Sequence, residues 1–236
     1  DNVQNAAGRI ASQADLQATI GVLAQQGGEL VAQDELSLSG ASLDNRDGGL
    51  VGATKALKLT VDAIDNRAGE ISSQSSIDFK AQHLDNSAGK LIAGTALELA
   101  VAHVINQAQG MIFARDNRFN GARLDNGQGT FAGQQSLSMS LVAIPGTELD
   151  GRLDNQLGKI SSEGTLQVSS ATLNNDAGAV SSAGALTLAA SGAITNQGGV
   201  METDAALTLT SASLDNGPKG LLNSRGALTL ATGTLN

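Results

Sequence analysis

The 236-residue sequence has no cysteine, no tryptophan and no tyrosine, and it has only 2 prolines. Without cysteine, no disulfide can stabilise the fold or indicate a redox compartment. Aromatic residues make up 2% of the chain, which is too little for the core of an ordinary globular protein of this length. The core must therefore consist of small and aliphatic side chains, and the scarcity of proline leaves almost every backbone amide free to join a sheet.

Cations are also scarce, because 14 Lys and Arg face 23 Asp and Glu for a formal net charge of -9. Nucleic-acid binding needs clustered cations, so nucleic acid is excluded as a partner. No window approaches the roughly 18 uninterrupted apolar residues of a membrane span, and no charged-then-apolar signal segment opens the chain. The sequence begins and ends inside repeats, and we expect it to be a piece of a longer protein.

The chain is dominated by repetition. The string Leu84-Asp85-Asn86-Ser87-Ala88-Gly89-Lys90-Leu91 returns, slightly edited, about every twenty residues. With the apolar residue before the Asx pair as the origin, copies begin at Val3, Leu23, Leu43, Ile64, Leu84, Ile105, Leu124, Leu153, Leu173, Ile194, Leu214 and Leu235. A period kept over the whole chain is the signature of a solenoid whose coils contact only their neighbours.

Each repeat predicts three short strands. An alternating segment such as Glu70-Ile71-Ser72-Ser73 follows the glycine, a Leu-x-Leu triplet such as Leu97-Glu98-Leu99 comes next, and the following origin residue lies on the third strand. The sequence therefore predicts an all-β fold, a parallel β-helix (solenoid) of about eleven coils with roughly 20 residues per coil. We expect one domain over residues 1–236, regular over 3–104 and 153–236 and irregular over 105–152.

Amides occupy the position two after each origin. We expect them to stack as a hydrogen-bonded ladder between coils, with Gln25 and Gln107 as substitutes in a set that includes Asn5, Asn45, Asn66, Asn86, Asn126, Asn155, Asn175, Asn196 and Asn216. Glycine recurs in the turn that follows, for example at Gly48, Gly69 and Gly89. This glycine predicts either a positive φ or a close backbone approach that a Cβ would block.

Residues 105–152 break the pattern. The unit from Ile105 has only 19 residues, and Arg118-Phe119-Asn120-Gly121 replaces its Leu-x-Leu strand. The next unit is nine residues too long, with the excess inside 141–152. We expect Phe119 and Phe131 in the core and Phe113 facing outward. The insertion either binds a partner or accommodates a kink; for the first alternative, the candidate interaction residues are Phe113, Arg115, Arg118, Arg123, Leu141, Ile144 and Pro145, including an exposed apolar run from Leu141 to Ile144.

The repeat consensus, Leu-Asp-Asn-x-x-Gly-x-Ile-x-Ser-x-x-x-Leu-x-Leu-x-Ala, resembles the haemagglutinin repeats of filamentous-haemagglutinin-like exoproteins, over essentially the whole chain. That resemblance implies a right-handed parallel β-helix, export through an outer-membrane two-partner secretion transporter of a Gram-negative bacterium, and an extracellular fibre at the cell surface. Members of the family include adhesins, which act in virulence, and the stalks of contact-dependent growth inhibition proteins.

Side chains that could carry chemistry are periodic. Asp precedes the ladder amide in six repeats, at Asp44, Asp65, Asp85, Asp125, Asp154 and Asp215, which is the pattern of a repeated Asx turn rather than of a singular catalytic acid. His83 and His103 share one register and should stack, but no third ligand completes a metal set, and we expect them to be solvated. No catalytic residue, metal or cofactor is predicted.

The sequence predicts a structural or interaction segment that extends and presents adhesive or toxin elements to target cells. Expected partners are the secretion transporter, a target-cell receptor and, through unpaired strand edges in the terminal coils, a second copy end to end. The alternative is a polysaccharide-acting β-helix enzyme, which would need a groove with non-periodic acids and aromatic sugar platforms.

Overall fold

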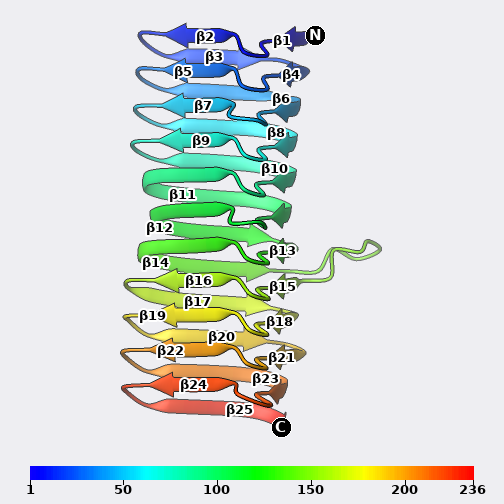
Figure 1. The fold of residues 1–236 in the computed structure, drawn as a ribbon, viewed down its shortest axis with the longest axis vertical. Helices are drawn as coiled ribbons and strands as arrows, with labels where there is room; N and C mark the ends of the chain where they lie inside the picture. The colour runs from blue at the N-terminus through cyan, green and yellow to red at the C-terminus, as the bar shows by residue number, and fades with distance from the viewer.

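A computed structural model describes all residues from 1 to 236 as strands and turns. The chain winds through about twelve turns that stack along one axis (Figure 1). Strands of successive coils pair in parallel and in register. The predicted all-β parallel solenoid is therefore confirmed. No helix long and apolar enough to cross a membrane is present.

Each coil has three flat sides, and strands of the same side stack on one another. The first side consists of β2 (Arg9–Ser12), β5 (Glu29–Ala32), β7 (Leu50–Ala53), β9 (Glu70–Ser73), β16 (Lys159–Ser162), β19 (Ala179–Ser182), β22 (Val200–Thr203) and β24 (Leu221–Ser224). The second side consists of β3 (Leu16–Thr19), β17 (Thr165–Ser170) and β20 (Leu186–Ala190). The third side consists of β1 (Asn2–Gln4), β4 (Val22–Ala24), β13 (Arg123–Asp125), β15 (Arg152–Asp154), β18 (Thr172–Asn174) and β21 (Ala193–Thr195).

Longer strands run around the corners without a break. The second and third sides are joined in β6 (Leu36–Asp44), β8 (Leu57–Asp65), β10 (Ile77–Asp85), β23 (Leu207–Asp215) and β25 (Leu228–Leu235). The first and second sides are joined in β12 (Met111–Gly121) and β14 (Thr130–Leu141), and β11 (Lys90–Ile105) covers all three.

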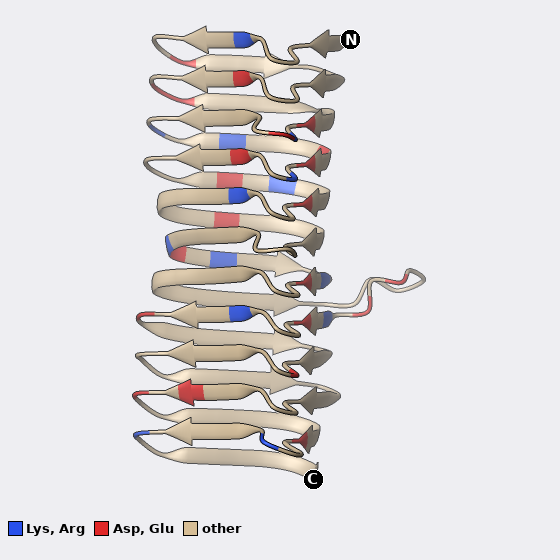
Figure 2. Ribbon diagram, viewed as in Figure 1, with Lys and Arg blue, Asp and Glu red and all other residues tan.

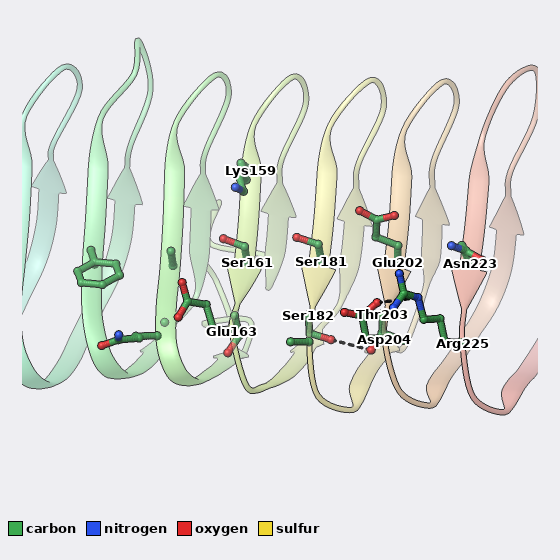
Figure 3. A pocket seen from close by; sticks show the side chains of 16 residues that line it. Lys159, Ser161, Glu163, Ser181, Ser182, Glu202, Thr203, Asp204, Asn223 and Arg225 are labelled. Atoms are coloured by element: carbon green, nitrogen blue, oxygen red, sulfur yellow. Dashed lines mark hydrogen bonds and ion pairs between the residues drawn. The ribbon is translucent and has the colours of Figure 1, made fainter.

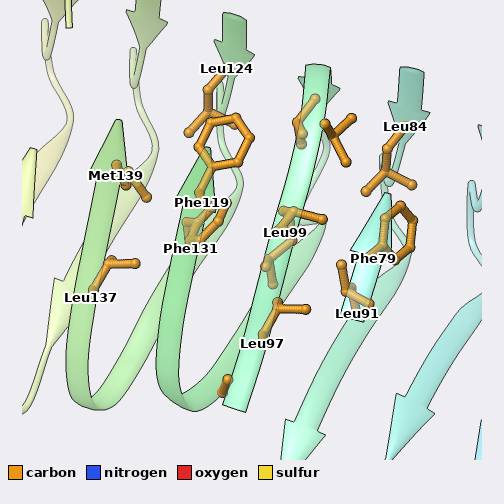
Figure 4. Packing of buried hydrophobic residues seen from close by; sticks show 14 of the residues in the cluster. Phe79, Leu84, Leu91, Leu97, Leu99, Phe119, Leu124, Phe131, Leu137 and Met139 are labelled. Atoms are coloured by element: carbon orange, nitrogen blue, oxygen red, sulfur yellow. The ribbon is translucent and has the colours of Figure 1, made fainter. Parts of the chain in front are cut away.

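The core is one continuous column of apolar side chains. Successive residues of a strand point to opposite faces, so in β9 only Ile71 and the small Ser73 turn inward, and Ile71 lies in register with Val51 and Leu91. A cluster of 44 buried apolar residues runs along the axis. Figure 4 shows Phe119 and Phe131 packed among leucines, with ring centroids 5.9 Å apart. Their predicted core positions are confirmed.

The amide ladder is present and fully buried along most of its length. Asn66 Nδ2 donates to Asn86 Oδ1 at 2.7 Å and also to the Lys90 carbonyl at 3.1 Å, so both N–H groups have acceptors. Every rung except the last donates toward the next coil in the same direction, through Asn5, Gln25, Asn45, Asn66, Asn86, Asn106, Asn126, Asn155, Asn175, Asn196 and Asn216. Each buried amide left without partners would cost about 1–3 kcal/mol, so the ladder fixes the register of every coil.

One predicted rung was wrong. Gln107 is exposed, whereas Asn106 is buried and bonds to Asn86 and Asn126, each 20 residues away. The origin of this coil is Val104, which pairs with Leu84 and Leu124, so the coil is not shortened to 19 residues. An extra residue in its turn, between Asn106 and Gly110, is cancelled by a missing residue at its next corner.

The predicted loss of a strand at Arg118 was also wrong. β12 continues through this segment, with Asn117 in register with Leu97 and Phe119 in register with Leu99. Both side chains are buried. The strand is kept because a large apolar ring at Phe119 preserves the inward alternation.

The recurring glycine is required by a close approach. A Cβ on Gly89 would lie 2.1 Å from the carbonyl oxygen of Asn66 in the preceding coil. The positive φ belongs to the residue before it, Ala88, at 56°. In the coil of Asn45 the matching residue is Gly49 rather than Gly48, because that turn also has an extra residue.

The substitution Gly89→Ala should lower the free energy of unfolding by about 3 kcal/mol or more, because the Asn66 carbonyl and the ladder beside it must shift. Its neighbour provides the control: Ala88→Gly relieves a left-handed alanine and should change stability by about 1 kcal/mol at most. Thermal and urea unfolding of both variants measures the difference, and equal destabilisation would contradict the close-approach explanation.

Candidate functional site

The nine-residue excess forms a loop that leaves the rod between β14 and β15 and projects away from it (Figure 1). We call residues 142–150 the insertion loop. At its base, Val142 N donates to the Gly121 carbonyl at 2.8 Å and Gly151 N donates to the Ala122 carbonyl at 2.9 Å. Arg123 and Arg152 remain in register across the insertion. In the view of Figure 1 the coils before and after the loop stay stacked in one line.

The insertion loop closes on its own turn. Thr147 N and Oγ1 both contact the Ile144 carbonyl, at 3.3 and 2.8 Å, and Ile144 N donates to the Leu149 carbonyl at 2.7 Å. Pro145 and Gly146 occupy the central positions, with Gly146 at a φ of 78°, as a type II turn requires. This turn presents Ile144, which is 39% exposed, beside Val142, which is 67% exposed.

The predicted interaction residues lie on different faces. Phe113 is on the first side and partly buried, Arg115 is at the next corner, and Arg118 projects from the second side. Arg123 is on the third side, close to the base of the insertion loop. Leu141 is only 4% exposed, so its predicted place in an exposed apolar run was wrong: β14 turns its side chain into the core. Only Arg123, Ile144 and Pro145 share one region.

A cluster of charged side chains lies at the base of the insertion loop. Asp125 accepts hydrogen bonds from His103 Nε2 at 2.9 Å and from Arg123 Nε at 3.0 Å, and Arg152 is 3.5 Å away. Its burial is the largest influence on its pKa and opposes ionisation. The bonds from His103 and Arg123 outweigh burial and lower the pKa of Asp125 to about 2. The carboxylate is therefore ionised at any physiological pH and holds three coils together.

The two histidines are less exposed than predicted. His83 and His103 are in register, with ring centroids 5.2 Å apart, and both are partly buried. Burial of His83, followed by the nearby His103, lowers the pKa of His83. No group of three or more His, Cys, Asp or Glu side chains is placed to hold a metal ion.

The column of aspartates along the third side is largely neutralised by arginines from the same turns (Figure 2). Arg46 contacts Asp44 at 2.8 Å and Asp65 at 3.4 Å, and Arg67 contacts Asp65 at 2.7 Å. The bond from Arg46 outweighs burial and lowers the pKa of Asp44. These carboxylates stabilise turns and neighbouring coils, as a repeated Asx turn predicts.

Sequence reasoning missed a shallow groove of about 470 Å3 on the first side (Figure 3). It is hollow because Ala132, Ser161 and Ser181 are small and lie in one column with Glu202 and Asn223. Phe113 lies at one end, and Asp204, paired with Arg225 at 3.1 Å, lies near the other. Aligning the third residue of each first-side strand could have revealed this column.

These features define a β-solenoid repeat protein, in which the ladder, the core and the turns recur from coil to coil and only the insertion loop and the groove are individual. Comparison with protein families matches the haemagglutinin repeat at residues 1–62, 41–110, 100–140, 147–198 and 197–236. The chain belongs to the haemagglutinin repeat family. No curated protein and no solved structure matches it.

Acid should destabilise the rod in two steps. The fold disfavours protonation of His83, so stability falls as the pH drops below about 6.5. The lowered pKa of Asp125 contributes about 2 kcal/mol above pH 4, which is lost as the pH falls toward 2. Urea midpoints across this range measure both steps, with His83→Gln removing the first and Asp125→Asn the second.

The exposed carboxylate of Asp62 serves as a control for these measurements, since it lies at a corner of the rod. Asp62→Asn should leave the pH profile nearly unchanged. A profile for Asp125→Asn that matches the unsubstituted protein below pH 4 would show that the cluster does not stabilise the fold.

Proposed function

We propose that this segment is the spacer of a secreted bacterial surface fibre, where it extends adhesive or toxin elements toward target cells. The observation that carries the proposal is the unbroken ladder, which holds coil after coil in one register from Asn5 to Asn216. A stack in which each coil adds about 4.8 Å converts chain length directly into distance. Such a segment sets the distance between the elements at its two ends. Its regular sides need no binding or catalytic residues for this role.

The family supports a location outside the cell. We propose that the parent protein of a Gram-negative bacterium crosses the outer membrane through a two-partner secretion transporter and remains extracellular or at the cell surface, as an adhesin or as the stalk of a contact-dependent growth inhibition protein. A fold stabilised without disulfides is compatible with this route, because its assembly needs no oxidation step. The proposal leaves the choice between adhesive and toxin elements to the rest of the parent chain.

A structural role has better support than the alternative of a polysaccharide-acting enzyme. Third-side carboxylates such as Asp44 and Asp65 are periodic and engaged by arginine. In the groove, Asp204 is paired with Arg225, whereas Glu163 and Glu202 form no ion pair. The groove therefore has non-periodic acids, but the chain has no Trp or Tyr to form the aromatic sugar platform that this alternative needs.

We further propose that specific recognition by this segment resides within 105–152. The regular sides present nearly the same small polar residues in every coil, so a partner would find no preferred register on them. The insertion loop is individual: it combines the exposed Val142 and Ile144 with the turn at Pro145, and its base adjoins the paired strands that carry Arg123 and Arg152. Phe113, Arg115 and Arg118 would belong to a second contact on other faces of the preceding coil.

Removing two whole coils tests the spacer role. Deletion of residues 45–85 joins Asp44 to Asn86, so that Asn86 replaces Asn45 beside Gln25 in the ladder. The variant should stay folded and become shorter by roughly 10 Å, as measured by small-angle scattering. In the parent exoprotein, cell binding or toxin delivery should persist with reduced reach.

An out-of-phase deletion gives the control for that experiment. Deleting residues 45–75 joins a third-side strand to a second-side strand, breaks the ladder and should unfold neighbouring coils. Loss of cell binding by the folded in-phase variant would show that the deleted coils carry recognition rather than length.

Deleting the insertion loop tests recognition separately. Removal of residues 142–150 joins Leu141 to Gly151 and restores the corner found at Gly121 and Ala122. Stability should change by about 1 kcal/mol or less, because the loop makes few contacts with the rod, while binding to target cells should fall at least tenfold. Undiminished binding by the folded variant would contradict the proposal.

A point substitution refines this test. Ile144→Asp should weaken binding without affecting the melting curve, since the side chain lies outside the core. Leu157→Asp is a matched control, because Leu157 is an apolar turn residue with 57% exposure elsewhere on the rod. Equal losses from both substitutions would indicate a nonspecific charge effect.

A further inference from the structure

The first inward-facing residues of the second-side strands form a column along the rod. One member of this column is not aliphatic. The members of the column are Leu16, Leu36, Leu57, Ile77, Leu97, Asn117, Leu137, Leu166, Leu186, Leu207 and Leu228. Asn117 is 2% exposed. Its Nδ2 donates to the Ala132 carbonyl at 3.0 Å, but its Oδ1 is buried without any donor. A buried acceptor without a partner weakens the fold at that point.

Unsatisfied groups are confined to this part of the rod. Three buried side-chain polar atoms lack hydrogen-bond partners, namely Asn117 Oδ1, Arg152 Nε and Ser170 Oγ. They fall in three consecutive coils, those that begin at Val104, Leu124 and Leu153. The Asn ladder beside them is satisfied throughout. Buried side-chain polar atoms without hydrogen-bond partners are therefore confined to the centre of the rod.

The coil of Asn117 also has an altered corner. Three steps separate Ala114 from Asn117, against four from Ala93 to Leu97, and the pairing register shifts on both sides of this coil. Phe119 and Phe131 fill the adjacent core with ring carbons, which offer no hydrogen-bond donor to Asn117. Asn117 Oδ1 therefore receives no hydrogen bond from these rings.

In a solenoid the coils interact only with their neighbours, so the weakest coil decides where the stack opens. We propose that Asn117 is a built-in weak point, at which the rod between its end coils opens first and divides into two cooperative units. The coils before Val104 form one unit and those after Leu153 form the other. A rod divided in this way yields at a fixed internal position, while the coils on either side keep their ladder.

Native-state hydrogen exchange read by mass spectrometry tests this in the unsubstituted protein. Backbone amides of β12 should exchange at least tenfold faster than those of β8 and β20, which lie in the two units. Protection of β12 equal to that of β8 and β20 would overturn the proposal.

Substitutions then assign the effect to Asn117. Asn117→Leu completes the aliphatic column and should slow exchange in β12 by roughly tenfold or more, with little change in β8. Leu97→Asn, introduced into the Asn117→Leu protein, should move the fast-exchanging region to β11. If Asn117→Leu leaves the exchange of β12 unchanged, the weak point is not Asn117 and the proposal fails.

Discussion

The structure depends on the hydrogen bond that each ladder amide donates to the next coil. A buried amide tolerates no slip, because a shift of one residue would leave a donor and an acceptor without partners on every rung. The turn geometry follows from this bond: Gly89 must lack a Cβ so that the Asn66 carbonyl can sit against it. The apolar column then packs between coils that already share a register. The ladder hydrogen bond thus determines both the register of the coils and the alignment of the core.

Outward-facing residues can vary between coils without loss of the fold, because neither the ladder nor the core includes them. Along the third side that freedom is taken up by arginines and aspartates, whose contacts join adjacent coils. At Asp125 the side chains of His103, Arg123 and Arg152, from three coils, converge on one buried carboxylate at the base of the insertion loop. The strands on either side of the insertion are therefore joined by a shared carboxylate as well as by their backbone pairing.

Much of the fold could be predicted from the sequence because its period, its strand alternation and its turn residues agree with one another. The failures have physical causes. Gln107 and Asn106 are both amides, and Gln107 stands at the usual three-residue interval before the turn glycine, Gly110. An extra turn residue makes that interval misleading, whereas the even 20-residue spacing to Asn86 and Asn126 favours Asn106. Alternation predicted that Phe113 faces outward, but only the corner between Phe113 and Arg118 shows that the two residues lie on different sides of the rod. The groove was missed because it arises from small residues that no motif marks.

The ladder hydrogen bonds all point in one direction along the rod. Coils can therefore be added layer by layer, as molecules are added to a crystal face. A coil that is already ordered presents Asn86 and the strand edges beside it as a finished surface, onto which the next coil can settle. Each added coil takes the register of the coil beneath it, so neighbouring coils have nearly the same outline. Gene segments that encode one full layer can therefore be duplicated or lost without altering the layers that remain, and the length of such a molecule can evolve independently of its cross-section.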